Sequence, residues 1–69
     1  MDYVLYEHHD RHVAVITLNR PERLNALGSQ MRQELEEALQ MAARDPDVRV
    51  AIIAGAGRSF CAGADVKEW

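Results

Sequence analysis

Val48-Arg49-Val50-Ala51-Ile52-Ile53-Ala54 is nearly all apolar. Such a run is typical of a strand that is buried on both faces of a parallel sheet. The preceding residues 29–44 predict an amphipathic helix, and residues 12–18 before them predict another strand. A strand, a helix and a buried strand in succession predict a right-handed βαβ crossover. The expected fold class is therefore α/β, with these two strands parallel.

The predicted helix has an apolar stripe and recognisable ends. Ser29 is expected to be its N-cap. The helix should end near Arg44, because the residue before Pro46 is pushed out of the helical region. The apolar residues at helical spacing are Met31, Leu35, Ala38, Leu39 and Ala42. We expect this stripe to pack on the sheet.

The N-terminal residues 3–18 predict a β-hairpin. Residues 3–8 are aromatic and β-branched, a polar turn follows at residues 9–11, and residues 12–18 form the second strand. The histidines His8, His9 and His12 raise the question of a metal site. Alternation sends His8 and His9 to opposite faces, and no cysteine or carboxylate pattern completes a ligand set. Solvated turn histidines are the favoured interpretation.

Residues 19–27, Asn19-Arg20-Pro21-Glu22-Arg23-Leu24-Asn25-Ala26-Leu27, interrupt the strand pattern and predict a loop. Pro21 cannot donate to a sheet ladder, and Asn19 and Asn25 suit turns. Arg20 and Arg23 have the fork geometry that suits phosphate. From the residues alone, solvated loop charges are the favoured interpretation and phosphate contacts are the alternative.

The stretch Ser59-Phe60-Cys61-Ala62-Gly63-Ala64-Asp65 reads as a turn into a second helix. Its small residues would let a ligand approach the backbone closely. Asp65 as N-cap would place the amides near Ala64 at the positive end of a helix dipole, where an electron-rich oxygen is stabilised. A tight turn without a ligand is the alternative. Cys61 is favoured as a small turn residue over a nucleophile, because no histidine lies near it in sequence.

Composition excludes several other functions. The chain has 69 residues, a net charge of -3 and one cysteine, which suits a small domain in a reducing compartment. No basic stripe favours nucleic acid, and no apolar run is long enough to span a membrane. A cytoplasmic protein is therefore expected, with an organelle lumen as the alternative. Gly55-Ala56-Gly57 lacks the third glycine of a dinucleotide fingerprint. Glu34, Glu36 and Glu37 could supply paired carboxylates, but Glu36 and Glu37 belong to an exposed helix face.

Two motifs at a fixed separation carry a family resemblance. Thr17-Leu18-Asn19-Arg20-Pro21-Glu22-Arg23-Leu24-Asn25-Ala26-Leu27 and, after the helix and the strand, Ser59-Phe60-Cys61-Ala62-Gly63-Ala64-Asp65-Val66-Lys67-Glu68 resemble the N-terminal part of the enoyl-CoA hydratase/isomerase, or crotonase, family. The resemblance spans nearly the whole chain. It implies the first part of a crotonase-like spiral fold, with residues 1–69 a partial domain that is incomplete at its C-terminus.

The resemblance implies roles for single residues. The backbone N–H of Ala64 is similar to the first of the two donors of the family's oxyanion hole, where a thioester carbonyl is polarised toward an enolate. Gly63 would let the thioester approach, and Asp65 would hold the helix start. The residues that match the path of coenzyme A are Arg23, Leu24, Ala26, Ala62 and Lys67. Arg20 is expected to be structural.

The resemblance also implies what the chain takes part in. Coenzyme A would enter as part of an acyl-CoA thioester substrate, with no permanently bound cofactor and no metal. Hydration of a 2-enoyl-CoA is the favoured reaction; the alternatives are double-bond isomerisation or related chemistry, and a non-catalytic CoA-binding or assembly module. The second oxyanion donor and the acid–base residues are expected beyond Trp69, so the isolated chain should be inactive. The full-length protein is expected to form trimers or pairs of trimers.

Overall fold

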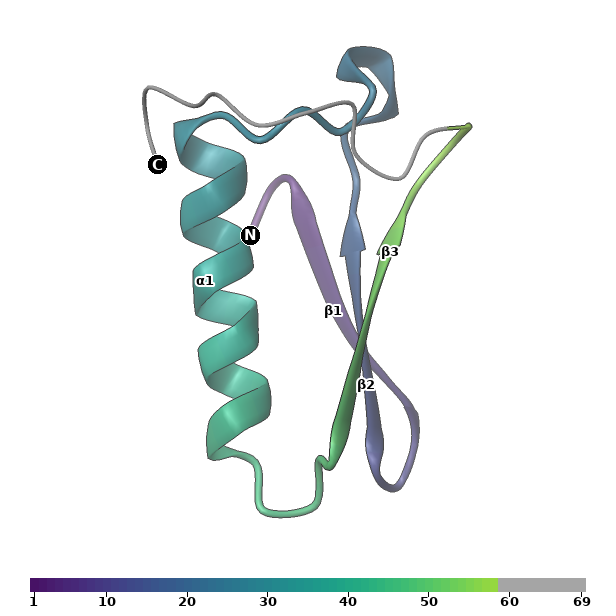
Figure 1. Ribbon diagram of the computed structural model, residues 1–69, viewed down its shortest axis with the longest axis vertical. Helices are drawn as coiled ribbons and strands as arrows, with labels where there is room; N and C mark the ends of the chain where they lie inside the picture. The colour runs from purple at the N-terminus through teal and green to yellow at the C-terminus, as the bar shows by residue number, and fades with distance from the viewer. Residues whose placement is uncertain (59–69) are drawn as a thin grey trace.

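The computed structural model describes residues 1–58 and shows a small sheet with one helix against it (Figure 1). The elements are β1 (Val4–Asp10), β2 (Val13–Leu18), a 3-10 helix η1 (Pro21–Arg23), α1 (Ser29–Arg44) and β3 (Val50–Gly55). The strand order is β1-β2-β3, with β1 antiparallel and β3 parallel to β2. The hairpin, the crossover and the α/β class are therefore confirmed. The predicted start of a second helix lies outside the described residues.

The hairpin turn is one place where the sequence prediction is wrong in detail. β1 continues to Asp10, and the turn consists of Arg11 and His12 instead of residues 9–11. The backbone N–H of His12 donates to Asp10 Oδ1 at 2.9 Å, which is the bond of an Asx turn. The register shifts between His8 and Asp10. Because the Asp10 side chain closes the turn, β1 extends to Asp10, two residues past the predicted end of the strand at His8.

Helix α1 has the predicted bounds but a different N-cap. Gly28 occupies the cap position in an extended conformation, with ψ of -173°, and Ser29 is the first helical residue. No side chain caps this end of the helix. At the other end the Asp45 N–H donates to the carbonyls of Met41 and Ala42 at 3.2 and 3.3 Å. The helix thus stops before Pro46, as predicted.

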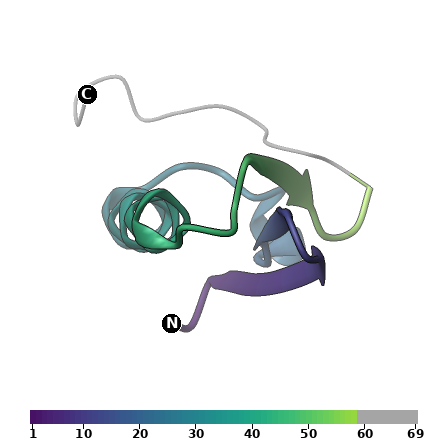
Figure 2. The same ribbon diagram turned by 90° about the horizontal axis from the view of Figure 1, so that it is seen from below.

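The core lies between α1 and one face of the sheet, which Figure 2 shows from below. Alternate residues of β2 are buried on this face. The buried cluster consists of Val4, Ile16, Leu18, Met31 and Ala38. Leu39, predicted to belong to the apolar stripe, is 40% exposed, whereas Glu34, which lies outside the predicted stripe, is buried. The helix therefore meets the sheet along Met31, Glu34, Ala38 and Ala42.

Strand β3 is more exposed than its composition predicts. It starts at Val50, two residues later than predicted, and Val50, Ile52 and Ile53 are 53%, 47% and 36% exposed. Among residues 1–58 it is an edge strand paired only with β2. Burial on both faces, which the apolar run predicts, is therefore not found in this part of the chain.

Candidate functional site

The segments that carry the predicted site residues start at one edge of the sheet. β2 and β3 are parallel neighbours, and Leu18 at the end of β2 is paired with Gly55 at the end of β3. Residues 19–28 follow the first strand, and the segment that leads to residue 59 follows the second (Figure 1). Ligands of open α/β sheets commonly bind outside the carboxyl ends of the strands. The topology thus brings the two predicted segments to the kind of edge where a ligand is expected.

Loop 19–28 holds its shape through its own backbone. The N–H groups of Arg23, Leu24 and Asn25 donate to carbonyls of Pro21 or Arg20, each at 3.0 Å. Pro21 stands at the first turn of η1, where its missing N–H leaves no helical bond unmade. Leu24 and Asn25 both have positive φ, 54° and 57°. Left-handed conformations cost a non-glycine residue roughly 1–2 kcal/mol, so the surrounding bonds must hold Leu24 in place.

Three of the predicted site residues lie in this loop. Arg23 and Ala26 are exposed, and Leu24 is half-buried, so the loop presents a charged group and a short apolar surface. Arg20 is arranged differently, because its guanidinium lies over the ring of Tyr3 at 4.4 Å from the centroid. A cation over an aromatic face is a stabilising contact. This geometry agrees with the structural role expected of Arg20.

The remaining predicted residues are Ala62, Gly63, Ala64, Asp65 and Lys67, with Cys61 among the alternatives. All of them lie outside the described residues. The oxyanion role of the Ala64 N–H, the approach at Gly63 and the helix start at Asp65 therefore stay predictions. The described chain leads toward them through Ala56, whose N–H donates to Leu18 O at 2.8 Å and so extends the pairing past β3.

Sequence reasoning missed the side chain of Asn25, which it assigned only a turn preference. Asn25 is fully buried. Its Oδ1 accepts from the backbone N–H of Arg20 at 2.8 Å, and its Nδ2 donates to the carbonyl of Ala56 at 2.9 Å. The amide therefore joins loop 19–28 to the residue that follows β3. The signal available in the sequence was an asparagine between two apolar residues, which does not reveal a partner 31 positions away.

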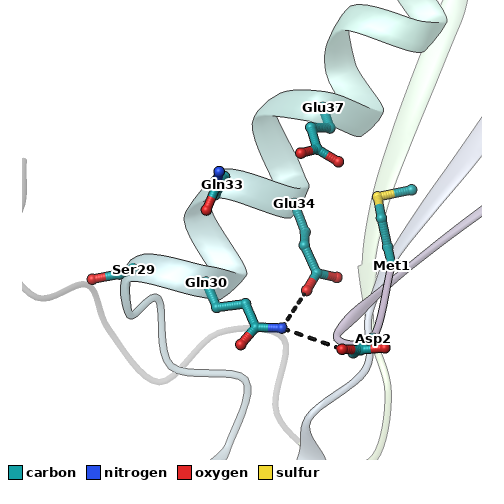
Figure 3. A pocket seen from close by; sticks show the side chains of 7 residues that line it. All are labelled: Met1, Asp2, Ser29, Gln30, Gln33, Glu34 and Glu37. Atoms are coloured by element: carbon teal, nitrogen blue, oxygen red, sulfur yellow. Dashed lines mark hydrogen bonds between the residues drawn. The ribbon is translucent and has the colours of Figure 1, made fainter.

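Sequence analysis considered Glu34 only as a possible member of a carboxylate pair and did not predict its burial. It lies in an open pocket of about 520 Å³ beside the first half of α1 (Figure 3). Glu34 Oε1 accepts from the N–H groups of Tyr3 and Val4 at 2.7 and 3.0 Å, and Oε2 accepts from Gln30 at 2.9 Å. Figure 3 shows Gln30 reaching from Glu34 toward Asp2. The pocket contains none of the predicted site residues. The sequence signal for the burial of Glu34 was its place on the helix, three residues after Met31 and four before Ala38, on the same face as these two apolar residues.

The protonation of Glu34 follows from these contacts. Burial by itself raises the pKa of the carboxyl group, because it disfavours charge. The hydrogen bonds from Gln30, Tyr3 and Val4, together with the positive amino terminus, outweigh burial and hold the pKa of Glu34 below its ordinary value. Glu34 is therefore a carboxylate at neutral pH. The carboxylate of Glu34 holds the start of β1 through these hydrogen bonds. Because the same bonds disfavour its protonation, Glu34 is poorly suited to carry a proton.

Two of the three histidines, His8 and His12, make contacts at the opposite end of the sheet. His8 Nε2 lies 3.1 Å from Asp45 Oδ2, and His12 Nδ1 lies 2.8 Å from the carbonyl of Asp47. They join the hairpin to the turn between α1 and β3, which is a more specific role than the predicted solvated turn. A search of residues 1–58 finds no group of three or more histidine, cysteine or acidic residues placed to hold a metal.

Comparison with known proteins assigns the family. The sequence of residues 8–69 matches the family model described as enoyl-CoA hydratase/isomerase. The chain belongs to this family. The crotonase-type resemblance predicted from the two motifs is therefore confirmed.

Individual enoyl-CoA hydratase/isomerase family members support the same assignment. The probable enoyl-CoA hydratase EchA14 of Mycobacterium tuberculosis is 51% identical over 58 residues, which are 84% of this chain and 23% of that protein. The 1,2-epoxyphenylacetyl-CoA isomerase of Escherichia coli is 43% identical over 68 residues, 99% of this chain and 26% of that protein. The chain thus spans about a quarter of the length of these relatives.

Solved structures of the family have the same fold. The crystal structure of an enoyl-CoA hydratase/isomerase from Mycobacterium paratuberculosis superposes with a TM-score of 0.87 at 47% identity, over 96% of this chain and 26% of that one. An enoyl-CoA hydratase from Bacillus anthracis gives 0.85 at 37% identity, over 97% and 26% of the two chains. At these values the likeness covers both sequence and fold.

In residues 1–58, no helix has the length and apolar character needed to cross a membrane.

Proposed function

We propose that the complete protein is an acyl-CoA enzyme that stabilises a thioester enolate, and that this chain supplies its CoA-contacting loop and its first oxyanion donor. The proposal is supported by one observation: loop 19–28 and the segment after β3 both begin at the paired C-terminal ends of β2 and β3. One segment would hold the nucleotide end of the substrate through Arg23, Leu24 and Ala26. The other would hold the thioester at Ala64, beside Gly63 and Asp65, and would place Ala62 and Lys67 on the opposite side of the coenzyme A path.

Hydration of a 2-enoyl-CoA is the favoured reaction, and several similar proteins are named hydratases. Isomerisation is the second candidate, because the relative that aligns over 99% of this chain is an isomerase by name. Both reactions draw on the same polarised thioester, so the half-site formed here serves either. Coenzyme A enters as part of the substrate in this proposal. We further propose that the complete protein is cytoplasmic, acts in fatty acid metabolism and assembles as a homotrimer or hexamer.

The reaction is tested on the complete protein with two thioesters. Hydration removes the conjugated absorbance of a 2-enoyl-CoA, whereas isomerisation of a 3-enoyl-CoA creates it. Binding of CoA thioesters without either change would favour the non-catalytic module. Sedimentation of the same preparation measures whether it is a trimer, a hexamer or another assembly.

The oxyanion role is tested by substitution at Ala64. Ala64→Ser keeps the backbone N–H and should retain most activity, whereas Ala64→Pro deletes it. Loss of one such donor should lower kcat by roughly 10²–10³-fold, with a much smaller change in the Kd of an unreactive acyl-CoA analogue. The comparison requires variants with unchanged melting temperature. Near-normal kcat in a folded Ala64→Pro variant would refute the assigned role.

A further inference from the structure

Asn25 uses both ends of its side-chain amide between two different segments. Its Oδ1 accepts inside loop 19–28, from the N–H of Arg20, and its Nδ2 donates out of the loop to the carbonyl of Ala56. The side chain is fully buried and the residue has φ of 57°. A buried amide is stable only where its polar atoms have partners. The bond to Ala56 therefore fixes where the loop lies relative to the end of β3.

The chemistry of this position favours asparagine. Among non-glycine residues, asparagine and aspartate tolerate positive φ best. Aspartate could accept from Arg20, but its second carboxylate oxygen would face the Ala56 carbonyl oxygen, and two acceptors repel each other. Of the two residues, only asparagine supplies both an acceptor for the Arg20 N–H and a donor for the Ala56 carbonyl.

A second contact joins the same two segments independently of Asn25. Gly57 has φ of +81°, and a Cβ placed on it would lie 2.7 Å from Cβ of Pro21. The backbone after β3 thus packs directly on the first residue of η1. Loop 19–28 and residues 56–57 are consequently joined by a polar contact, which Asn25 supplies, and by a steric contact.

We propose that Asn25 is a positioning residue that sets the separation between the CoA-contacting loop and the segment that carries Ala64. This inference rests on the proposed function. A substrate held at its nucleotide end by one segment and at its thioester by the other reacts only when both segments are correctly spaced. A misplacement of about 1 Å can lower a rate by roughly 100-fold. Asn25 acts through the two segments and does not itself touch the substrate.

The test uses two substitutions in the complete protein. Asn25→Asp keeps the acceptor for the Arg20 N–H and removes the donor to Ala56 O. Asn25→Gly permits the positive φ and removes the side chain, and with it the bonds to Arg20 and Ala56. In Asn25→Asp we expect amide hydrogen exchange at residues 56–57 to become at least ~10-fold faster while loop 19–28 keeps its protection. In Asn25→Gly both segments should lose protection.

The kinetic arm separates positioning from general destabilisation. We expect kcat of Asn25→Asp to fall by roughly 10–100-fold, with the Kd of free CoA changed less than about 3-fold, because the loop that carries Arg23, Leu24 and Ala26 stays intact. Ala42→Gly is the control, since it weakens α1 at the end remote from loop 19–28. It should lower the melting temperature but leave kcat and the exchange at residues 56–57 near wild type.

The outcomes distinguish the two proposals. Unchanged exchange at residues 56–57 in both Asn25 variants would overturn the positioning role. Faster exchange with wild-type kcat and KM would overturn it as well, because the contact would then have no effect on the reaction. A wild-type protein that turns over no acyl-CoA would refute only the proposed enzyme function, and the exchange measurements would still decide whether Asn25 couples the segments. If Asn25→Asp fails to fold, Asn25→Gly decides by the same measurements.

Discussion

At the scale of single residues, Glu34 stabilises the start of the sheet more directly than any charge on the surface of α1. It is 7% exposed and accepts from two backbone N–H groups of the N-terminal segment. Glu34→Gln keeps one oxygen for these N–H groups, but it removes the negative charge and places a donor opposite the Gln30 amide that now donates to Oε2. Hydrogen bonds to a charged group contribute roughly 1.5–3 kcal/mol, and we expect a loss of stability of about 1–3 kcal/mol.

Glu37→Gln is the matched control, because Glu37 lines the same pocket but is exposed. Surface substitutions of this kind usually change stability by less than about 0.5 kcal/mol. Urea denaturation of the two variants and of the wild type measures the difference. Equal midpoints for the two variants would show that the buried carboxylate adds nothing to stability.

Glu34 also predicts a dependence of stability on pH. Its pKa is lower in the folded protein than its ordinary value of 4.5. The stability it contributes is therefore fully present above that ordinary value and is lost as the pH falls through the lower folded pKa. The acidic groups that line the same pocket are Asp2 and Glu37, and the amino terminus adds positive charge. We expect the difference in melting temperature between wild type and Glu34→Gln to be constant near neutral pH and to shrink below about pH 4.5. A difference that stays constant throughout acidification would contradict this.

At the scale of elements, two glycines of the βαβ unit, one before α1 and one after β3, respond differently to an added side chain. Gly28 caps α1 in an extended conformation, and a Cβ there would meet nothing within 4 Å. Gly28→Ser adds a capping hydroxyl and restricts the unfolded chain, so we expect a gain of roughly 0.5–1 kcal/mol. Gly57→Ser should instead destabilise by at least about 1 kcal/mol, because its positive φ and the contact with Pro21 both oppose a side chain. Thermal unfolding measures both, and a shared sign would contradict the assignment.

The elements themselves were largely predictable. The bounds of α1 follow from its 3.6-residue period and from Pro46, and the parallel pairing of β2 and β3 follows from the crossover. The residues that sequence misjudged depend on partners distant in the chain. Glu34 and Asn25 find theirs at Tyr3, Val4 and Ala56, about 30 positions away. A local pattern shows neither such a partner nor the burial that it permits.

At the scale of the whole molecule, the uncovered strand β3 predicts how residues 1–69 behave when isolated. An exposed apolar edge strand is a template for pairing with another chain. We expect the isolated chain to self-associate as its concentration rises and to turn over no enoyl-CoA. Ile52→Lys should reduce this association, because it places a charge on the outward face of β3.

Met41→Lys is the control for added charge, since Met41 is similarly exposed but lies on α1. It should leave the association largely unchanged. Sedimentation velocity over a range of concentrations compares the three chains. A wild-type chain that stays monomeric, or equal effects of the two lysines, would show that β3 is not the contact surface.

In loop 19–28, the groups that fix the backbone conformation differ from the side chains that face outward. The bend of the loop is set by bonds between backbone groups and by the buried amide of Asn25, whereas the side chains of Glu22, Arg23 and Ala26 are exposed. Replacing those side chains therefore leaves the bend intact and changes only the charge and bulk that the loop presents. Single mutations can explore new recognition here from a constant scaffold, which gives the lineage an evolvable surface at little risk to the fold.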